Sequence, residues 1–196
     1  MANRNTQGFG LIAQGTVGST PATGGQGKYL IDAGMGVDLF QGTAVRSAAG
    51  YIVTAQAAIT NTCIGVLNGI FYNDATTKKP TFANFYNQPI TPANSEDITA
   101  FVIDNPNQLF VASIDAAAAQ AEYGKTYGLT VTAAGSEISG QSSSELTYAT
   151  RHATNNQWRL VRTAEDPENN DIAAANCSVV VAHNLNQYFT GAVTWQ

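Results

Sequence analysis

Charge is the scarcest property of this 196-residue chain. Asp, Glu, Lys and Arg together make up 12% of its residues, whereas ordinary soluble domains carry about 25%. Ala, Thr, Asn, Gln, Ser and Gly take their place. Charged side chains keep the surface of a monomer soluble and are depleted at the cores of protein interfaces. The composition therefore indicates a surface that meets other protein.

Basic clusters are also missing. The net charge is −5, and the longest basic run is the pair Lys78-Lys79. Binding to a phosphate backbone requires several clustered cations. The sequence thus predicts that nucleic acid is not a partner.

Long apolar runs are absent as well. No segment approaches the roughly 20 apolar residues of a membrane span, and the start, MANRNTQGFGLIAQG, lacks the apolar stretch of a signal peptide. We expect no contact with membranes and synthesis in a cytoplasm. With only two cysteines, Cys63 and Cys177, that compartment favours two buried reduced thiols.

Motifs that would place a metal or a cofactor do not occur. Zinc sites use closely spaced ligand pairs, and Cys63, Cys177, His152 and His183 form none. The acidic run EDPENND (165–171) lacks the glycine and the final glutamate of a calcium loop, which favours a solvated turn over an ion site. The glycine-rich start contains neither a Walker lysine nor a complete G-x-G-x-x-G pattern. We predict no metal and no cofactor.

Catalytic signatures are equally scarce. The chain has two histidines, each without an accompanying motif, and we interpret both as structural. GSEISG (135–140) has Glu137 where a nucleophile elbow needs serine. No pair of carboxylates is singled out for glycoside hydrolysis, where the spacing is spatial rather than sequential. We predict that the protein is not an enzyme.

Short apolar runs punctuated by Gly and Asn are what the sequence does contain. They are rich in Val, Ile, Tyr, Phe and Thr, and turn residues follow every 8–12 positions. This pattern predicts an all-β fold, a sandwich or barrel of about ten short strands, the last of them at TGAVTWQ (190–196). One short helix is expected over 116–123, with Asp115 as its cap and Gly124 as its stop.

Two hairpins are predicted. Asn68-Gly69 lies between apolar runs and suits a type I′ turn, whose central residues need positive φ. Ile98–Ile103 and Leu109–Ile114 flank the five-residue loop DNPNQ, a typical hairpin length.

The chain divides into an extended N-terminal arm, 1–27, and a single β domain, 28–196, with a long loop at 73–95. The arm is nearly uncharged yet carries apolar residues, so we expect it to lie along another surface. The predicted partner contacts are Phe9, Leu11 and Ile12 in the arm and Phe82, Phe85 and Tyr86 in the loop. An alternative is a β-sandwich carbohydrate-binding module, in which the loop aromatics, with Tyr72, stack on sugar.

Four stretches of the chain resemble one family. They are GFGL…GSTPATGG…KYLIDAG…DLFQGTAV, then IGVLNGIFYND…KPTF, then ITAFVIDNPNQLFVASID, and finally WRLVRTAEDPENN…VVVAHNLNQY. Together they are similar to the head decoration (cement) proteins of tailed bacteriophages, in which a Gly-Val/Leu-x-Gly-x-x-Tyr hairpin precedes an extended loop. An Asp-x-Pro hinge and a Phe-containing strand then follow, matched here by Asp104, Pro106 and Phe110.

This resemblance implies a structural role without a catalytic site or cofactor. Such proteins bind the outer surface of the phage head and clamp adjacent subunits of the major capsid protein, often as homotrimers. The expected location is therefore the virion. Repetition over a symmetric shell would multiply many modest contacts through avidity.

Overall fold

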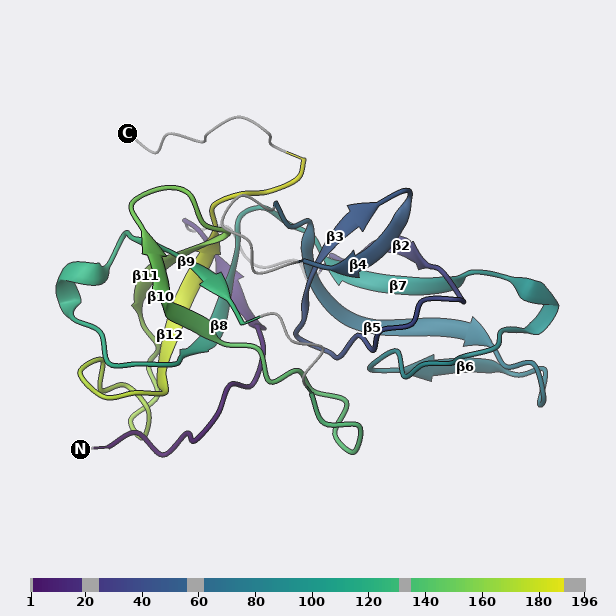
Figure 1. The fold of residues 1–196 in the computed structure, drawn as a ribbon, viewed down its shortest axis with the longest axis horizontal. Helices are drawn as coiled ribbons and strands as arrows, with labels where there is room; N and C mark the ends of the chain where they lie inside the picture. Colours follow the sequence, from purple (N-terminus) through teal and green to yellow (C-terminus); the bar gives the residue numbers. More distant parts are fainter. Residues whose placement is uncertain (1, 19–24, 56–61, 131–134, 189–196) are drawn as a thin grey trace.

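The computed structural model describes residues 2–18, 25–55, 62–130 and 135–188. These residues form twelve strands in two six-stranded sheets and two isolated 3-10 turns (Figure 1). The predicted all-β fold is confirmed. The strand expected at 190–196 lies outside the described residues.

Five strands of the first sheet close into a barrel. β8 pairs with β10 on one edge and with β12 on the other, which completes the ring β8-β10-β9-β11-β12. β1 is not part of the ring and pairs with the N-terminal half of β8, residues 108–111. Alternate side chains face the interior, where Phe110, Trp158 and Val181 are fully buried. The strands are β1 (Ile12–Thr16), β8 (Gln108–Ile114), β9 (Thr126–Leu129), β10 (Leu146–His152), β11 (Trp158–Thr163) and β12 (Cys177–His183).

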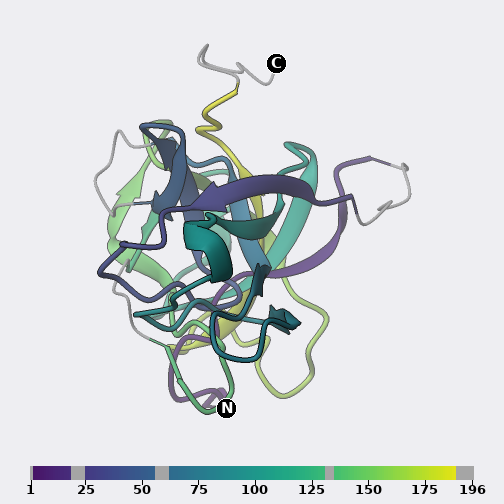
Figure 2. The same cartoon turned by 90° about the vertical axis from the view of Figure 1, so that its right-hand side faces the viewer.

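The second sheet has the order β2-β7-β5-β3-β4, and β6 pairs with the C-terminal half of β5. Its own core contains Ile31, Ile52, Ile70 and Ile98. The two sheets lie end to end along the long axis, and Figure 2 views this axis with the second sheet in front. The strands are β2 (Gly27–Ile31), β3 (Ala44–Ala48), β4 (Tyr51–Thr54), β5 (Gly65–Asn73), β6 (Pro80–Ala83) and β7 (Ile98–Ile103).

The segment with the DNPNQ loop joins the two sheets and is not a hairpin. β7 and β8 have almost the predicted bounds, but β7 pairs with β2 and β5 whereas β8 pairs with β1, β10 and β12. Each strand is central in its own sheet, because partners on both sides bury its apolar residues more completely than one hairpin partner could. The turn between them is held by Asn105, whose carbonyl accepts the amide of Gln108 at 3.0 Å.

The hairpin predicted at Asn68-Gly69 is also wrong. β5 runs unbroken through both residues, and its register against β7 shifts between Leu67 and Gly69, which is a β-bulge. The side chain of Asn68 accepts a hydrogen bond from the Gln41 amide at 3.0 Å.

The predicted helix over 116–123 is reduced to a single 3-10 turn, Gln120–Glu122. Asp115 does not cap it, because its carboxylate accepts the backbone amide of Tyr148 at 2.8 Å. Gly124 does adopt a left-handed conformation, with φ of 87°. Two turns are too short to be stable alone, so tertiary contacts decide the local conformation.

The described part of the N-terminal arm lies on its own barrel. The Asn3 amide donates to the carbonyls of Asp171, Ala174 and Ala175, and Arg4 pairs with Glu168. Further along, β1 adds to β8. The arm therefore forms part of the first sheet; its residues 19–24 lie outside the described chain.

Candidate functional site

The outer face of the second sheet carries an exposed aromatic cluster. Phe82 on β6 is 70% exposed, and its ring stacks on Phe101 of β7 at a centroid distance of 5.1 Å. Phe71 of β5 lies 5.8 Å from Phe82. We refer to Phe71, Phe82, Phe101 and the exposed Leu30 of β2 as the aromatic patch.

Strand register produces this patch. Leu30 lies opposite Thr99, Thr99 opposite Phe71, and Phe71 opposite Phe82, so one row of side chains crosses four strands on the same face. In the next row Phe101 lies opposite Gly69. A Cβ at Gly69 would meet the carbonyl oxygen of Ala83 at 3.0 Å, so the close approach of the Ala83 backbone favours glycine at this position.

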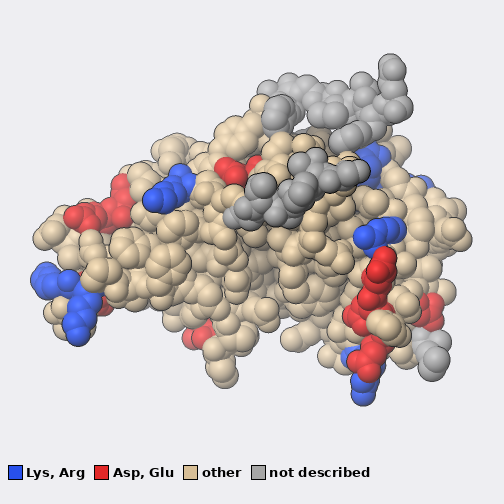
Figure 3. Space-filling model, turned by 180° about the vertical axis from the view of Figure 1, so that it is seen from behind, with Lys and Arg blue, Asp and Glu red and all other residues tan. Residues whose placement is uncertain are grey.

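Little charge surrounds the middle of the molecule. In Figure 3, which shows one face, charged side chains gather mainly toward the two ends, and the broad middle holds few. Lys78 and Lys79 lie in the turn between β5 and β6. The aromatic patch has a charged neighbour, because Lys28 of β2 lies opposite Phe101. Exposed aromatic rings on a chain with so little charge overall have the composition of an interface core.

Only one of the three loop residues predicted as partner contacts, Phe82, lies in this patch. Phe85 stacks instead on Phe40 at 5.4 Å. Tyr86 is fully buried, and its hydroxyl donates to the carbonyl of Met35 at 2.9 Å. Phe71 and Phe101 were missed because the sequence does not reveal which strands are neighbours; their alternation with buried residues was the available signal.

The three predicted contact residues of the arm also lie in different environments. Leu11 is 3% exposed and belongs to the barrel core, whereas Ile12 is 47% exposed. Phe9 and Ile12 line two grooves beside β1, one of about 250 Å³ that also contacts Val66 and one of about 340 Å³ that also contacts Val111. Leu11 and Tyr86 are thus occupied inside this chain, while Phe9 and Ile12 border open space.

The residues considered for zinc do not assemble. Sγ of Cys63 lies 3.4 Å from Nδ1 of His183, but Cys177 begins β12 and His183 ends it. Burial raises the pKa of the Cys63 thiol to about 12 and lowers the pKa of His183 to about 4. Both groups are neutral at pH 7, and a cysteine nucleophile acts as the thiolate. Within the described ranges no three His, Cys, Asp or Glu side chains are placed to hold an ion.

The carboxylates of the EDPENND segment stabilise their own turn. Asp166 accepts the Asn169 amide at 2.8 Å and the backbone amide of Glu168 at 3.1 Å, and these contacts hold the pKa of Asp166 below its ordinary value, with Asn169 the larger influence. Glu168 pairs with Arg4. This arrangement agrees with a solvated turn.

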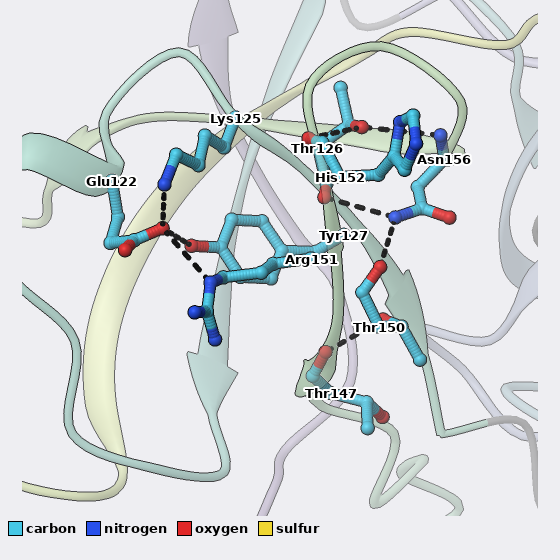
Figure 4. A network of polar contacts seen from close by, with 9 residues as sticks. All are labelled: Glu122, Lys125, Thr126, Tyr127, Thr147, Thr150, Arg151, His152 and Asn156. Carbon is cyan, nitrogen blue, oxygen red and sulfur yellow. Dashed lines mark hydrogen bonds and ion pairs between the residues drawn. The ribbon is translucent and has the colours of Figure 1, made fainter.

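A second polar cluster ties β9 and β10 together (Figure 4). The Glu122 carboxylate accepts Lys125 at 3.0 Å and the Tyr127 hydroxyl at 3.3 Å, and Arg151 lies 3.6 Å away. Nearby, the buried Asn156 amide donates to the carbonyl of Thr126 at 3.0 Å. His152 accepts the amide of Thr154 at 3.2 Å. These contacts join neighbouring strands and turns, as expected of structural polar groups.

No family model, curated protein or solved structure matches this chain. Among the described residues, no helix is long and apolar enough to cross a membrane. The surfaces described above are therefore the features from which a function can be inferred.

Proposed function

We propose that this protein is a structural decoration (cement) protein of a phage head, which binds the outer capsid surface and stabilises adjacent major capsid subunits. The observation that carries the proposal is the aromatic patch on a molecule with so little charge. It supports a protein partner because aromatic residues concentrate binding energy at the centres of protein interfaces. The proposal includes no catalytic centre and no cofactor.

The fold provides a second line of support. A closed barrel has few free strand edges, so its backbone hydrogen bonds are protected when the molecule is held against a shell. Phe9 and Ile12 border two grooves: one lies between β1 and the strands β5 and β7 of the second sheet, and the other lies on the barrel, which is a different sheet from that of the aromatic patch. One molecule could therefore contact two neighbours at once, which is the geometry that clamping requires.

The major capsid protein and further copies of this chain are the proposed partners, with a homotrimer as the expected assembly and the virion surface as the location. A low-charge surface limits repulsion between copies. Each contact can be modest, because simultaneous engagement raises the effective concentration of the next.

The carbohydrate-binding alternative requires four aromatic side chains on one surface, and the structure does not bring them together. Its four aromatic residues separate: Phe82 lies in the aromatic patch, Phe85 against Phe40, and Tyr86 in the core. Tyr72 follows Phe71 in β5 and therefore points to the opposite face. No observation favours sugar over protein at the remaining cluster.

The test is co-sedimentation with expanded heads that lack this protein, prepared from the phage that encodes it. Phe82→Ser combined with Phe101→Ser should weaken head binding at least tenfold, because the patch loses its apolar rings. Ile138→Ser is the matched control, since Ile138 is fully exposed and lies outside the patch. Its binding should equal that of the wild type.

Circular dichroism must show that both variants fold. Head binding by the folded double variant at the wild-type level would contradict the proposal, as would a wild-type protein that does not sediment with heads. Light scattering on the free protein tests the trimer separately, and a monomer at every concentration would contradict that part.

A further inference from the structure

An apolar groove crosses the outside of the barrel, away from the aromatic patch. It has a volume of about 400 Å³ and is lined mainly by Thr16, Val17, Leu109, Arg159, Val161 and Ala182. Small-molecule sites in proteins have volumes from about 300 to 1,000 Å³. The groove is therefore large enough for a small ligand.

Strand register explains the hollow. Gly15 of β1 lies opposite Leu109 of β8, Leu109 opposite Ala182 of β12, and Ala182 opposite Arg159 of β11. The row thus runs from the long side chain of Arg159 over Ala182 and Leu109 to Gly15, so the small side chain of Ala182 lowers the floor beside Arg159. Val17 and Val161, both more than a third exposed, form apolar walls beside this floor.

Arg159 is the cation of the groove. Its Nη2 donates to Oδ1 of Asn184 at 2.6 Å, and its Nη1 donates to the carbonyl of Gly124. Both acceptors are neutral, and no carboxylate of the described chain lies within ion-pair distance of this guanidinium. Its Nε is buried without a hydrogen-bond partner.

An immobilised guanidinium that has no counter-ion among residues 2–18, 25–55, 62–130 and 135–188 and borders an apolar groove favours a ligand with a negative charge and an aliphatic body. Partly desolvated charges are costly unless they are paired. A carboxylate is the planar anion that matches the donors of arginine. The apolar walls then exclude water from a hydrocarbon chain.

We propose that this groove binds an aliphatic monocarboxylate, with the carboxylate at Arg159 and the chain over Leu109 and Ala182. The site is independent of the proposed capsid role, because it shares no residue with the aromatic patch. If the groove does not bind a monocarboxylate, the decoration proposal is unaffected. If the protein does not bind phage heads, the groove proposal is equally unaffected.

Decanoate is the probe, titrated below its aggregation concentration into the isotopically labelled full chain and followed by amide chemical shifts. We expect saturable shifts centred on the groove residues. Acetate, which lacks the chain, and decanol, which lacks the charge, should each bind at least tenfold more weakly. Equal binding of decanol and decanoate, or shifts centred elsewhere, would overturn the proposal, as would the absence of saturation.

Two variants and a control sharpen the test. Arg159→Gln should weaken decanoate binding at least tenfold and remove the preference over decanol. Ala182→Leu should fill the floor and block both ligands while leaving Arg159 in place, so it tests the site even if Arg159→Gln does not fold. Arg162→Gln is the matched control, because Arg162 is on the same strand but lies near Glu165 at 4.0 Å. Wild-type affinity in the folded Ala182→Leu variant, or an equal loss in Arg162→Gln, would contradict the assignment.

Discussion

His183 is the residue whose chemistry depends most on its surroundings. Its ring lies 4.4 Å from the ring of Trp158 and 5.6 Å from that of Phe110, and Nε2 has no hydrogen-bond partner. Burial lowers its pKa to about 4, from about 6.5 in an unfolded chain. The imidazole therefore packs as a neutral aromatic group.

This shift predicts a pH dependence of stability. Between pH 6.5 and pH 4 the unfolded chain binds the proton and the folded chain does not, so the free energy of unfolding falls as the pH falls through this window. The loss attributable to His183 should be roughly 3 kcal/mol. Urea unfolding of the wild type and of His183→Gln across this range measures it. Parallel pH curves for the two proteins would show that His183 does not titrate in this way.

At the scale of elements, the short segment made of β1 and the residue before it has one side chain in the core and the next one in solvent. Leu11 packs into the barrel core with Phe110 and Val179, whereas Ile12 faces solvent and the two grooves. Removing residues 1–15 would therefore take a core side chain as well as surface residues. Point variants separate the two effects.

Leu11→Ala should lower the free energy of unfolding by about 2–5 kcal/mol, since it leaves a cavity in the core. Ile12→Ser should change it by less than about 0.5 kcal/mol because the side chain is exposed. Chemical denaturation measures both values. Similar losses for the two variants would mean that the described faces of this segment are misassigned.

At the scale of the whole molecule, both cysteines are enclosed. Cys63 and Cys177 have no exposed surface, and burial raises the pKa of Cys177 to about 11. Cys63 contacts His183 near the end of β12, while Cys177 lies at its start. Neither thiol can react until the barrel opens.

A thiol reagent such as dithionitrobenzoate should therefore label neither cysteine of the native protein on the timescale in which it labels both in denaturant. Thiolate availability and access control the reaction. Absorbance at saturating reagent measures it, and a Cys63→Ser variant assigns each signal. Fast labelling of either cysteine under native conditions would contradict the enclosed barrel.

The sequence by itself determined the class of fold, because alternation of apolar and polar residues is a local property. The predicted bounds of β7 and of the segment 109–114 of β8 are confirmed, and Phe82, a predicted contact residue, is exposed. Low charge, read from composition alone, favours protein partners, which stays a prediction.

Only the tertiary structure decided which strands pair. The same local pattern fits a hairpin or two central strands of different sheets, and the choice depends on residues far away in the chain, such as the β12 partners of β8. The aromatic patch and the Arg159 groove follow from that choice, since each is a row of side chains from several strands brought into register. A one-residue change of register would have turned those side chains to the opposite face.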